Sequence, residues 1–158
     1  MSDAPDRDGF AFDATGRSLP IALLRAREKV MEHYRPMLQN HDLTEQQWRV
    51  IRVLDEAPGL DMGALAEAAN ILAPSLSRMT KTLEERGILD MRRTPGDGRR
   101  ASLSLTSNGS ALVQAIAPES AAISAEIEAR VGPGRVNALL DDLDKLIRDL
   151  EDGQGRAD

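Results

Sequence analysis

The sequence contains no cysteine, few aromatic residues and no long hydrophobic run. None of its 158 residues is cysteine, and 3% are aromatic. Without cysteine there is no disulfide, thiolate metal ligand, cysteine nucleophile or thiol-based redox sensor. No apolar stretch reaches the roughly 18 residues of a membrane-spanning helix. The first residues are acidic, whereas a signal peptide begins with positive charge. We therefore expect a cytoplasmic protein that has no membrane anchor.

Sequence motifs for catalysis and metal binding are also missing. The chain has no G-x-S-x-G, G-x-x-x-x-G-K-[ST] or H-E-x-x-H motif, the usual marks of a nucleophile elbow, a phosphate loop and a zinc protease. Its two histidines, His33 and His41, are eight residues apart and have no cysteine or tight acidic triad beside them. A metal site is therefore not expected. We predict that the protein is not an enzyme and carries no cofactor.

Positive charge is concentrated in the middle of an acidic chain. The net charge is −6, which on its own argues against a polyanionic partner. Residues 73–100 nevertheless contain seven basic residues (Lys and Arg) and four acidic ones (Asp and Glu). Residues 141–158 contain three basic residues and seven acidic ones. A polyanion responds to local positive charge more than to the total. Residues 73–100 are therefore the candidate region for contact with nucleic acid.

The chain begins with a predicted flexible arm and a long amphipathic helix. Residues 1–17 show neither helical nor strand periodicity, as is typical of a flexible segment. From Ser18, a candidate N-cap, apolar residues recur at the spacing of one buried helix face up to Leu38. We predict a first helix over residues 18–40.

Three short helices are expected to follow in close succession. Thr44 and Gln47 form a capping box at the start of one, and residues 62–69 form the next. After a tight turn, Pro74 suits the first turn of another helix, which ends at Gly87. The residues expected to face the core are Trp48, Ile51 and Leu54, then Leu65, then Leu76, Met79 and Leu83.

A β-hairpin and two long helices are expected to complete the chain. Beyond Gly87 the apolar period changes from near four to near two, over residues 88–93 and 101–105, which flank a Pro-Gly-Asp-Gly turn. Thr106 then caps a long helix, and the break at residues 132–134 separates it from the last helix. The predicted fold class is mainly α with a small β-hairpin wing.

The order of these elements is that of a winged helix-turn-helix: a helix, a tight turn, a second helix and a basic hairpin. The outward residues of the second helix are short hydroxyls and long cations, which suit contact with base edges in a major groove. A surface helix with an ordinary solvated polar face is the alternative interpretation. The candidate DNA-binding residues on this helix are Ser75, Ser77, Arg78, Lys81 and Thr82.

The hairpin supports DNA binding over a solvated helix face. Its tip carries Asp97, Arg99 and Arg100 around Gly98. A guanidinium there can enter a narrow minor groove, and the carboxylate can orient it. On the strand before the tip, Arg92 and Arg93 are expected to contact phosphates. An ordinary hairpin turn with solvated charges remains the alternative for the tip alone.

Several stretches between Ser18 and Leu150 resemble the multiple-antibiotic-resistance regulator (MarR) family. The matching stretches are Leu43-Thr44-Glu45-Gln46-Gln47-Trp48-Arg49, Ser77-Arg78, Leu83-Glu84, Gly87-Ile88-Leu89, Asp97-Gly98-Arg99 and Leu105-Thr106-Ser107-Asn108-Gly109. The chain is most similar to regulators of homoprotocatechuate and related aromatic-acid operons, through Ser18-Leu19, Ile21-Ala22-Leu23-Leu24, Ala26-Arg27-Glu28, Tyr34-Arg35-Pro36 and Leu72 with Pro74-Ser75-Leu76.

The resemblance implies a two-fold homodimer and a palindromic double-stranded DNA operator, with repression relieved by a phenolic or aromatic acid. It implies a single domain over residues 18–151, a DNA-binding lobe at 44–105 and a flexible tail at 152–158. Residues 18–40 and 107–151 are then the dimerisation helices. Ala73 and Arg78 differ from the arginine and the small residue expected in the homoprotocatechuate regulators, so base preference is not carried over.

Arg27 is the most informative residue of the first helix. It falls on an otherwise apolar stripe with Leu23, Val30 and Tyr34, and an inward-facing guanidinium needs an anionic partner. An aromatic carboxylate would satisfy its charge, while a ring side chain holds the aromatic part. An acid contributed across the dimer is the alternative partner. The candidate effector-binding residues are Arg27, Tyr34, His41, Trp48 and Arg52.

A helical protein-interaction module without DNA binding is the competing functional class. The terminal helices alone are enough to build a bundle. Such a module gives no reason for a basic hairpin with the sequence Asp97-Gly98-Arg99. We therefore interpret the chain as a sequence-specific DNA-binding transcriptional repressor.

Overall fold

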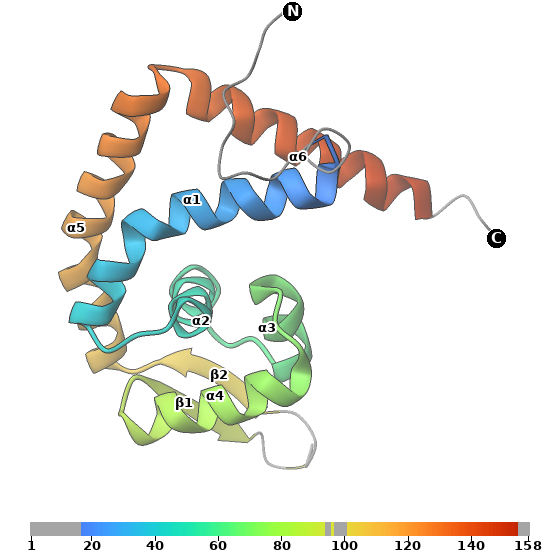
Figure 1. The fold of residues 1–158 in the computed structure, drawn as a ribbon. Helices are drawn as coiled ribbons and strands as arrows, with labels where there is room; N and C mark the ends of the chain where they lie inside the picture. The colour runs from blue at the N-terminus through green and yellow to red at the C-terminus, as the bar shows by residue number, and fades with distance from the viewer. Residues whose placement is uncertain (1–16, 94–95, 97–100, 155–158) are drawn as a thin grey trace, which may run out of the picture. The chain divides into compact units, whose positions relative to one another are not determined.

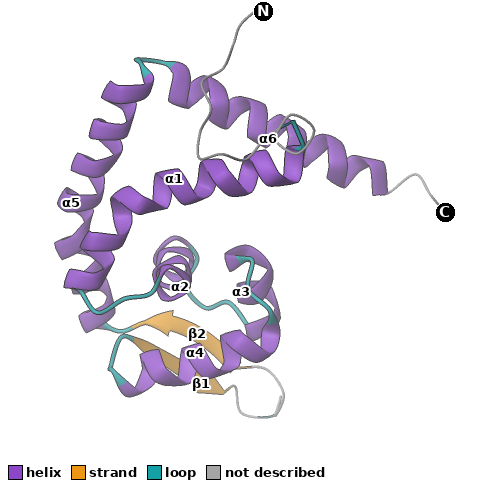
Figure 2. Ribbon diagram, in the orientation of Figure 1, coloured by secondary structure: helices purple, strands orange, loops and turns teal. Residues whose placement is uncertain are grey.

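The computed structural model describes residues 17–93, residue 96 and residues 101–154. Its contacts divide the chain into two compact units, Met1–Pro36 and Met37–Asp158, which are described separately. The predicted arm lies outside the described residues except for Arg17. Helices and one two-stranded sheet account for most of the described chain (Figure 2). The mainly α fold class with a hairpin wing is confirmed.

Helix α1 spans Leu19–Asn40, close to its predicted bounds, and passes from the first unit into the second. The amide of Ala22 donates to the Ser18 carbonyl at 2.8 Å, which begins the helical hydrogen bonding. Within the first unit, most of the helix surface is exposed, including Leu23, Leu24 and Val30. Most of the predicted apolar stripe in this unit is therefore exposed, while Tyr34 is half-buried.

Helices α2 (Glu45–Glu56), α3 (Met62–Ala69) and α4 (Ala73–Glu85) form the predicted compact group (Figure 1). The Thr44 hydroxyl accepts from the Gln47 amide at 3.1 Å, and the Gln47 side chain accepts from the Thr44 amide at 3.0 Å. This confirms the capping box. Gly87 ends the group in the left-handed region, with φ +71°, as predicted for a residue that has no Cβ to clash.

The hairpin consists of β1 (Leu89–Arg93) and β2 (Ala101–Leu105), paired antiparallel with Leu89 opposite Leu105. Leu60 adds a single bridge to Leu103, whose amide donates to the Leu60 carbonyl at 2.8 Å. Leu89 and Leu103 are buried on the same face of the hairpin. The hairpin is therefore attached to the helices through that face, and its other face is available for contact.

The core of the second unit is formed by aliphatic side chains from every element of the helical group and from the hairpin. Most of the predicted core positions are buried, but Trp48 and Met79 are only half-buried. Within helices α2 to α4, Val50 and Thr80 are also fully buried. Thr80 satisfies its hydroxyl by donating to the Ser77 carbonyl at 3.0 Å. The side chains below 2% exposure are Leu38, Val50, Ile51, Leu54, Leu65, Leu76, Thr80, Leu83, Leu89, Leu103 and Ile116.

Two long helices complete the second unit. Helix α5 runs over Ser107–Val131 and α6 over Arg135–Gln154, separated at the predicted glycine and proline break. Thr106 caps α5, as predicted, by accepting from the Gly109 amide at 3.1 Å. Helix α6 continues three residues beyond the predicted end at residue 151. No proline follows to interrupt its backbone hydrogen bonds, so the helix extends into the segment assigned to the tail, as far as Gln154.

Candidate nucleic-acid interface

Helix α4 presents one polar face to solvent and buries the other. All five predicted contact residues, Ser75, Ser77, Arg78, Lys81 and Thr82, are exposed. Leu76, Thr80 and Leu83 are buried on the opposite side and fix the rotation of the helix about its axis. This rotation turns short hydroxyls and two long cations outward together, which is the side-chain chemistry that reads base edges and phosphates.

The turn that precedes α4 is held by backbone hydrogen bonds. Asn70 adopts the left-handed conformation, with φ 52°, and the Ile71 amide donates back to the Ala66 carbonyl at 3.0 Å. This pattern satisfies carbonyl groups at the end of α3 and reverses the chain. From α2, the Arg49 guanidinium lies 3.5 Å from the Asn70 carbonyl. The start of α4 is therefore positioned by both preceding helices.

The far end of α4 is anchored by Arg86, which the sequence analysis missed. Its guanidinium donates to the carbonyl of Asp42 at 2.8 Å, and to that of His41 at 3.5 Å. These carbonyls belong to the turn between α1 and α2. A backbone carbonyl has no signature in the sequence, so no pattern could have identified this partner. The contact limits how α4 can tilt within its unit.

The hairpin places Arg92 and Arg93 in exposed positions on β1. The Arg92 Nε atom lies 3.1 Å from a carboxylate oxygen of Asp90, two residues earlier on the same face of the strand. Asp90 was not predicted as a partner of Arg92, although residues two apart on a strand share a face. The pair is exposed, so its own contribution to stability is small, and its main effect is to orient the guanidinium.

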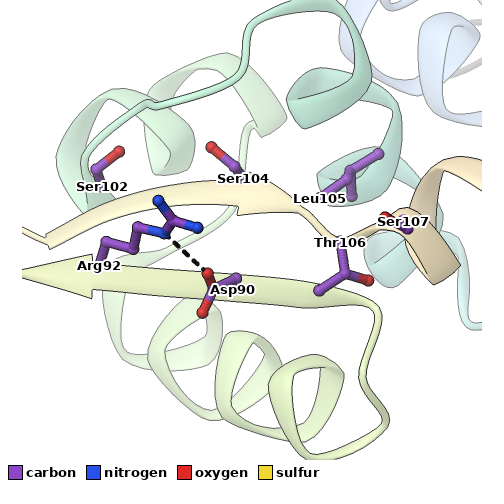
Figure 3. Close-up of a pocket in the computed structure, with 7 residues that line it drawn as sticks. All are labelled: Asp90, Arg92, Ser102, Ser104, Leu105, Thr106 and Ser107. Carbon is purple, nitrogen blue, oxygen red and sulfur yellow. Dashed lines mark hydrogen bonds and ion pairs between the residues drawn. The ribbon is translucent and has the colours of Figure 1, made fainter.

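An open polar pocket of about 600 Å³ lies beside this ion pair (Figure 3). Strand pairing sets Asp90 opposite Ser104 and Arg92 opposite Ser102, so all four side chains lie on one face of the hairpin. Thr106 and Ser107 close one end where α5 begins. The face combines hydroxyls with one cation and the carboxylate that orients it, and the exposed Arg92 guanidinium is suited to contact with a phosphate group. Asp97, Arg99 and Arg100, predicted at the wing tip, lie outside the described residues.

Of the predicted effector-binding residues, Arg27 and Tyr34 lie on α1 in the first unit. The Arg27 side chain is 43% exposed, and one of its nitrogens lies 3.9 Å from a carboxylate oxygen of Glu28. Glu28 pairs more closely with Arg35, at 2.8 Å. Tyr34 is half-buried. The proposed roles of Arg27 and Tyr34 remain predictions.

The other three predicted effector-binding residues lie in the second unit. The Arg52 guanidinium carbon is 6.0 Å from the centre of the Trp48 ring, the range of a cation–π contact, and Arg52 also pairs with Glu56 at 3.1 Å. His41 Nε2 lies 3.0 Å from a carboxylate oxygen of Glu119 on α5. The structure therefore brings Trp48 and Arg52 together and gives His41 an acidic neighbour that the sequence analysis missed.

Among the residues that the structure describes, no three His, Asp or Glu side chains gather closely enough to hold a metal ion. No helix in that part of the chain is both long and apolar enough to cross a membrane.

Comparison with known proteins identifies the family. A model of the MarR family matches residues 41–100, which include helices α2, α3 and α4 and strand β1. The homoprotocatechuate degradative operon repressor of Escherichia coli is 38% identical over 130 residues, covering 82% of this chain and 88% of that protein. The chain belongs to the MarR family. The predicted family is thus confirmed.

Solved structures of MarR-like regulators agree in fold with this chain. NadR in complex with 4-hydroxyphenylacetate has a TM-score of 0.72 and 36% identity, covering 90% of this chain and 97% of that one. The transcriptional repressor CouR, bound to a 23-mer DNA duplex, has a TM-score of 0.79 and 28% identity, covering 87% of this chain and 98% of that one. These relatives favour a transcriptional regulator over the helical interaction module and over an enzyme.

Proposed function

We propose that this MarR-family chain is a homodimeric, sequence-specific DNA-binding repressor of an aromatic-compound catabolic operon, and that an aromatic acid releases it. The observation that carries the proposal is the exposed face of α4, where Ser75, Ser77, Arg78, Lys81 and Thr82 point away from the core. The helix follows a fixed turn, as the second helix of a helix-turn-helix does. Since the target is DNA, we propose that the protein acts in the cytoplasm.

Recognition is divided between α4 and the hairpin. The N-terminal half of α4 enters the major groove, where Ser75, Ser77 and Arg78 meet base edges, while Lys81 and Thr82 contact the phosphate backbone. Arg92 and Arg93 add phosphate contacts along the wing. Phosphate contacts supply affinity that falls with salt, and base contacts supply sequence preference. Asp97, Arg99 and Arg100 at the wing tip are proposed to reach the adjacent minor groove.

Dimerisation is supported by apolar surface on the long helices. On α6, the side chains of Leu139, Leu140 and Ile147 are each more than half exposed. None of the α6 residues whose burial is described is buried. An isolated amphipathic helix is marginal in water, and a large exposed apolar face usually marks an interface. In the first unit, Leu23, Leu24 and Val30 of α1 are similarly exposed. A second copy that covers these faces would place two recognition helices on a palindromic operator.

The effector is proposed to be a phenolic or other aromatic carboxylic acid. Support comes from the relative that represses a homoprotocatechuate degradative operon and from NadR, whose structure holds 4-hydroxyphenylacetate. Arg27 or Arg52 would hold the carboxylate, and Tyr34 or Trp48 the ring, with His41 as a further polar contact. Release requires that the acid bind the DNA-free conformation more tightly than the DNA-bound one.

Fluorescence anisotropy on the promoter that neighbours the gene tests DNA binding and release together. The wild type is expected to bind this duplex more tightly than a scrambled one, and one acid from a phenolic panel should release it. Equal affinity for both duplexes would contradict sequence-specific recognition. If the protein binds DNA but no acid releases it, the proposed DNA binding stands and the proposed acid effector is refuted.

Arg27→Ala distinguishes the two proposed partners of Arg27. If Arg27 holds the carboxylate, the acid concentration for half-release should rise roughly ten-fold or more, because a hydrogen bond to a charged group is worth about 1.5–3 kcal/mol. The matched control is Arg25→Ala, which removes the same charge from an exposed position of the same helix. Unchanged release with a weaker dimer would assign Arg27 to an ion pair across the interface.

A further inference from the structure

Leu72 is the most exposed of the large hydrophobic side chains described, at 79%. A single exposed leucine is ordinary on a protein surface and needs no explanation by itself. Its position, however, is the N-cap of α4, immediately before the residues proposed to meet base edges. A side chain at that position approaches the DNA together with the N-terminal half of the helix.

Helix α4 lacks the N-terminal cap that neighbouring helices have. Thr44, Asp61 and Thr106 each accept a backbone amide hydrogen bond at the start of α2, α3 and α5. At α4 the N-cap is Leu72, which has no side-chain hydrogen bond. Leucine is among the least favourable N-cap residues, because it has no acceptor for the free amides. The sequence therefore places an apolar group where helix stability alone favours Ser, Thr, Asp or Asn.

The position of Leu72 is fixed rather than left to a loose loop. The preceding turn closes through the Ile71 amide on the Ala66 carbonyl, at 3.0 Å, and through the left-handed Asn70. On the other side, the Leu72 carbonyl accepts from the Leu76 amide at 3.0 Å, which starts α4. A side chain with both flanks held loses little backbone freedom on binding, so its contact is specific in geometry.

An open hollow of about 390 Å³ lies where α3 leads into α4, beside Leu72. Its lining is mixed: Ala66, Ile71, Leu72 and Ala73 contribute apolar surface, and Glu67 and Asn70 contribute polar side chains. In the major groove, the only apolar group that distinguishes one base pair from another is the C5 methyl of thymine. The exposed Leu72 side chain at the edge of this hollow is an apolar surface complementary to that methyl group.

We propose that Leu72 is a specificity-determining residue that contacts a thymine methyl group in each operator half-site. The inference rests on the proposed DNA-binding function and adds a base preference to it. Leu72 reads by apolar contact, whereas Arg78 and the serines read by hydrogen bonds. Thymine is therefore preferred over cytosine or uracil at that position, because neither of those bases has the methyl group.

Replacing thymine by deoxyuridine removes only the methyl group and provides the test. Each symmetric thymine pair of the operator is replaced in turn, and affinity is measured by anisotropy. At one thymine pair, the affinity of the wild type should fall about four-fold per half-site, which is the effect of removing one buried methyl group. Leu72→Ser should bind the thymine and deoxyuridine duplexes equally at that pair while keeping its sensitivity elsewhere. Leu72→Met keeps a long apolar side chain and should therefore discriminate between the thymine and deoxyuridine duplexes, as the wild type does.

The serine variant is expected to fold well, because it adds the missing N-cap. Its melting temperature should rise by roughly 2–4 °C, the shift produced by one typical cap in a chain of this size. The inference is overturned if the wild type ignores every methyl deletion, or if Leu72→Ser keeps the discrimination. It is also overturned if Leu72→Ser changes the association state, which would place Leu72 in a protein interface. A wild type that binds no duplex would refute the proposed function itself.

Discussion

At the scale of single residues, two kinds of position matter in the second unit. Some are exposed side chains proposed to contact DNA, and others are small residues that allow two backbone segments to pack closely. Arg78 is of the first kind, and its neighbours Leu76 and Thr80 are buried. Gly109 is of the second kind, because α5 passes directly beside the backbone that leads into β1. Substitutions at these positions should therefore affect different properties, namely DNA recognition at Arg78 and folding stability at Gly109.

Arg78→Ala should weaken operator binding by about 1–3 kcal/mol and relax preference at one operator position, because a bidentate arginine contact to guanine is worth that amount. Anisotropy on a set of singly substituted operators measures both effects. Thermal stability should be unchanged, since the side chain is exposed. A uniform loss on all duplexes, specific and scrambled alike, would instead place Arg78 on a phosphate.

Gly109→Ala should destabilise the fold. A Cβ at residue 109 would lie 2.1 Å from the Ile88 carbonyl oxygen, a backbone atom that cannot rotate away. Overpacking of this kind typically costs about 1–3 kcal/mol, so the melting temperature should fall by several degrees. Gly153→Ala is the matched control, because nothing lies within 4 Å of its Cβ position. Equal melting temperatures for the two variants would contradict the close approach of α5 to Ile88.

At the scale of elements, Thr106 joins the hairpin, the end of α4 and the start of α5. Its hydroxyl donates to the carbonyls of Gly87 and Ile88, at 2.5 and 3.1 Å, and accepts from the Gly109 amide. The sequence predicts the cap from the threonine that precedes a helical pattern. The carbonyl partners became visible only in the folded chain. One hydroxyl thus secures both the start of a long helix and the base of the wing.

Thr106→Val should lower the free energy of unfolding by about 1–2 kcal/mol. The substitution keeps the shape of the side chain but removes an N-cap acceptor and the donor to two part-buried carbonyls. Denaturant unfolding followed by circular dichroism measures the loss. Thr106→Ser keeps the hydroxyl and should recover most of the stability. If serine and valine are equally destabilising, packing of the methyl group rather than hydrogen bonding is the cause.

At the scale of the whole molecule, function is proposed to depend on a second copy. Leu140 and Ile147 lie seven residues apart on one stripe of α6, and each is 52% exposed. Among the residues of α6 whose burial is described, none is fully buried within its own chain. An interface on this helix would set the separation of the two recognition helices, and successive half-sites lie roughly 10–10.5 base pairs apart.

The double variant Leu140→Glu with Ile147→Glu should dissociate the dimer, because burying two carboxylates at an apolar interface is strongly unfavourable. Light scattering should give a mass near the 17.2 kDa of one chain, and operator affinity should fall sharply. Ala138→Glu with Lys145→Gln is the control, since it changes net charge equally at exposed positions on the other side of α6. Dissociation of both variants would point to charge repulsion. Dissociation of neither variant would mean that the dimer interface lies elsewhere.

The sequence by itself determined the order of the elements, the caps and the family. These are local properties: the Thr44 capping box, the left-handed Gly87 and the change of period at the hairpin depend on neighbours within a few residues. The outward face of α4 was predictable for the same reason, because helical spacing relates it directly to the buried leucines. The bounds of α6 were less secure, because a helix end without a proline has only a weak local signal.

Only the tertiary structure decided which distant groups meet. Arg86 reaches the Asp42 carbonyl, and His41 lies beside Glu119, across 44 and 78 positions of sequence. The exposure of Leu72 depends on the conformation of the turn between α3 and α4. The half-burial of Trp48 depends on the elements that pack against α2. Periodicity identifies the face of a helix, but the contacts of that face depend on how the elements pack around a shared core, which no local pattern specifies.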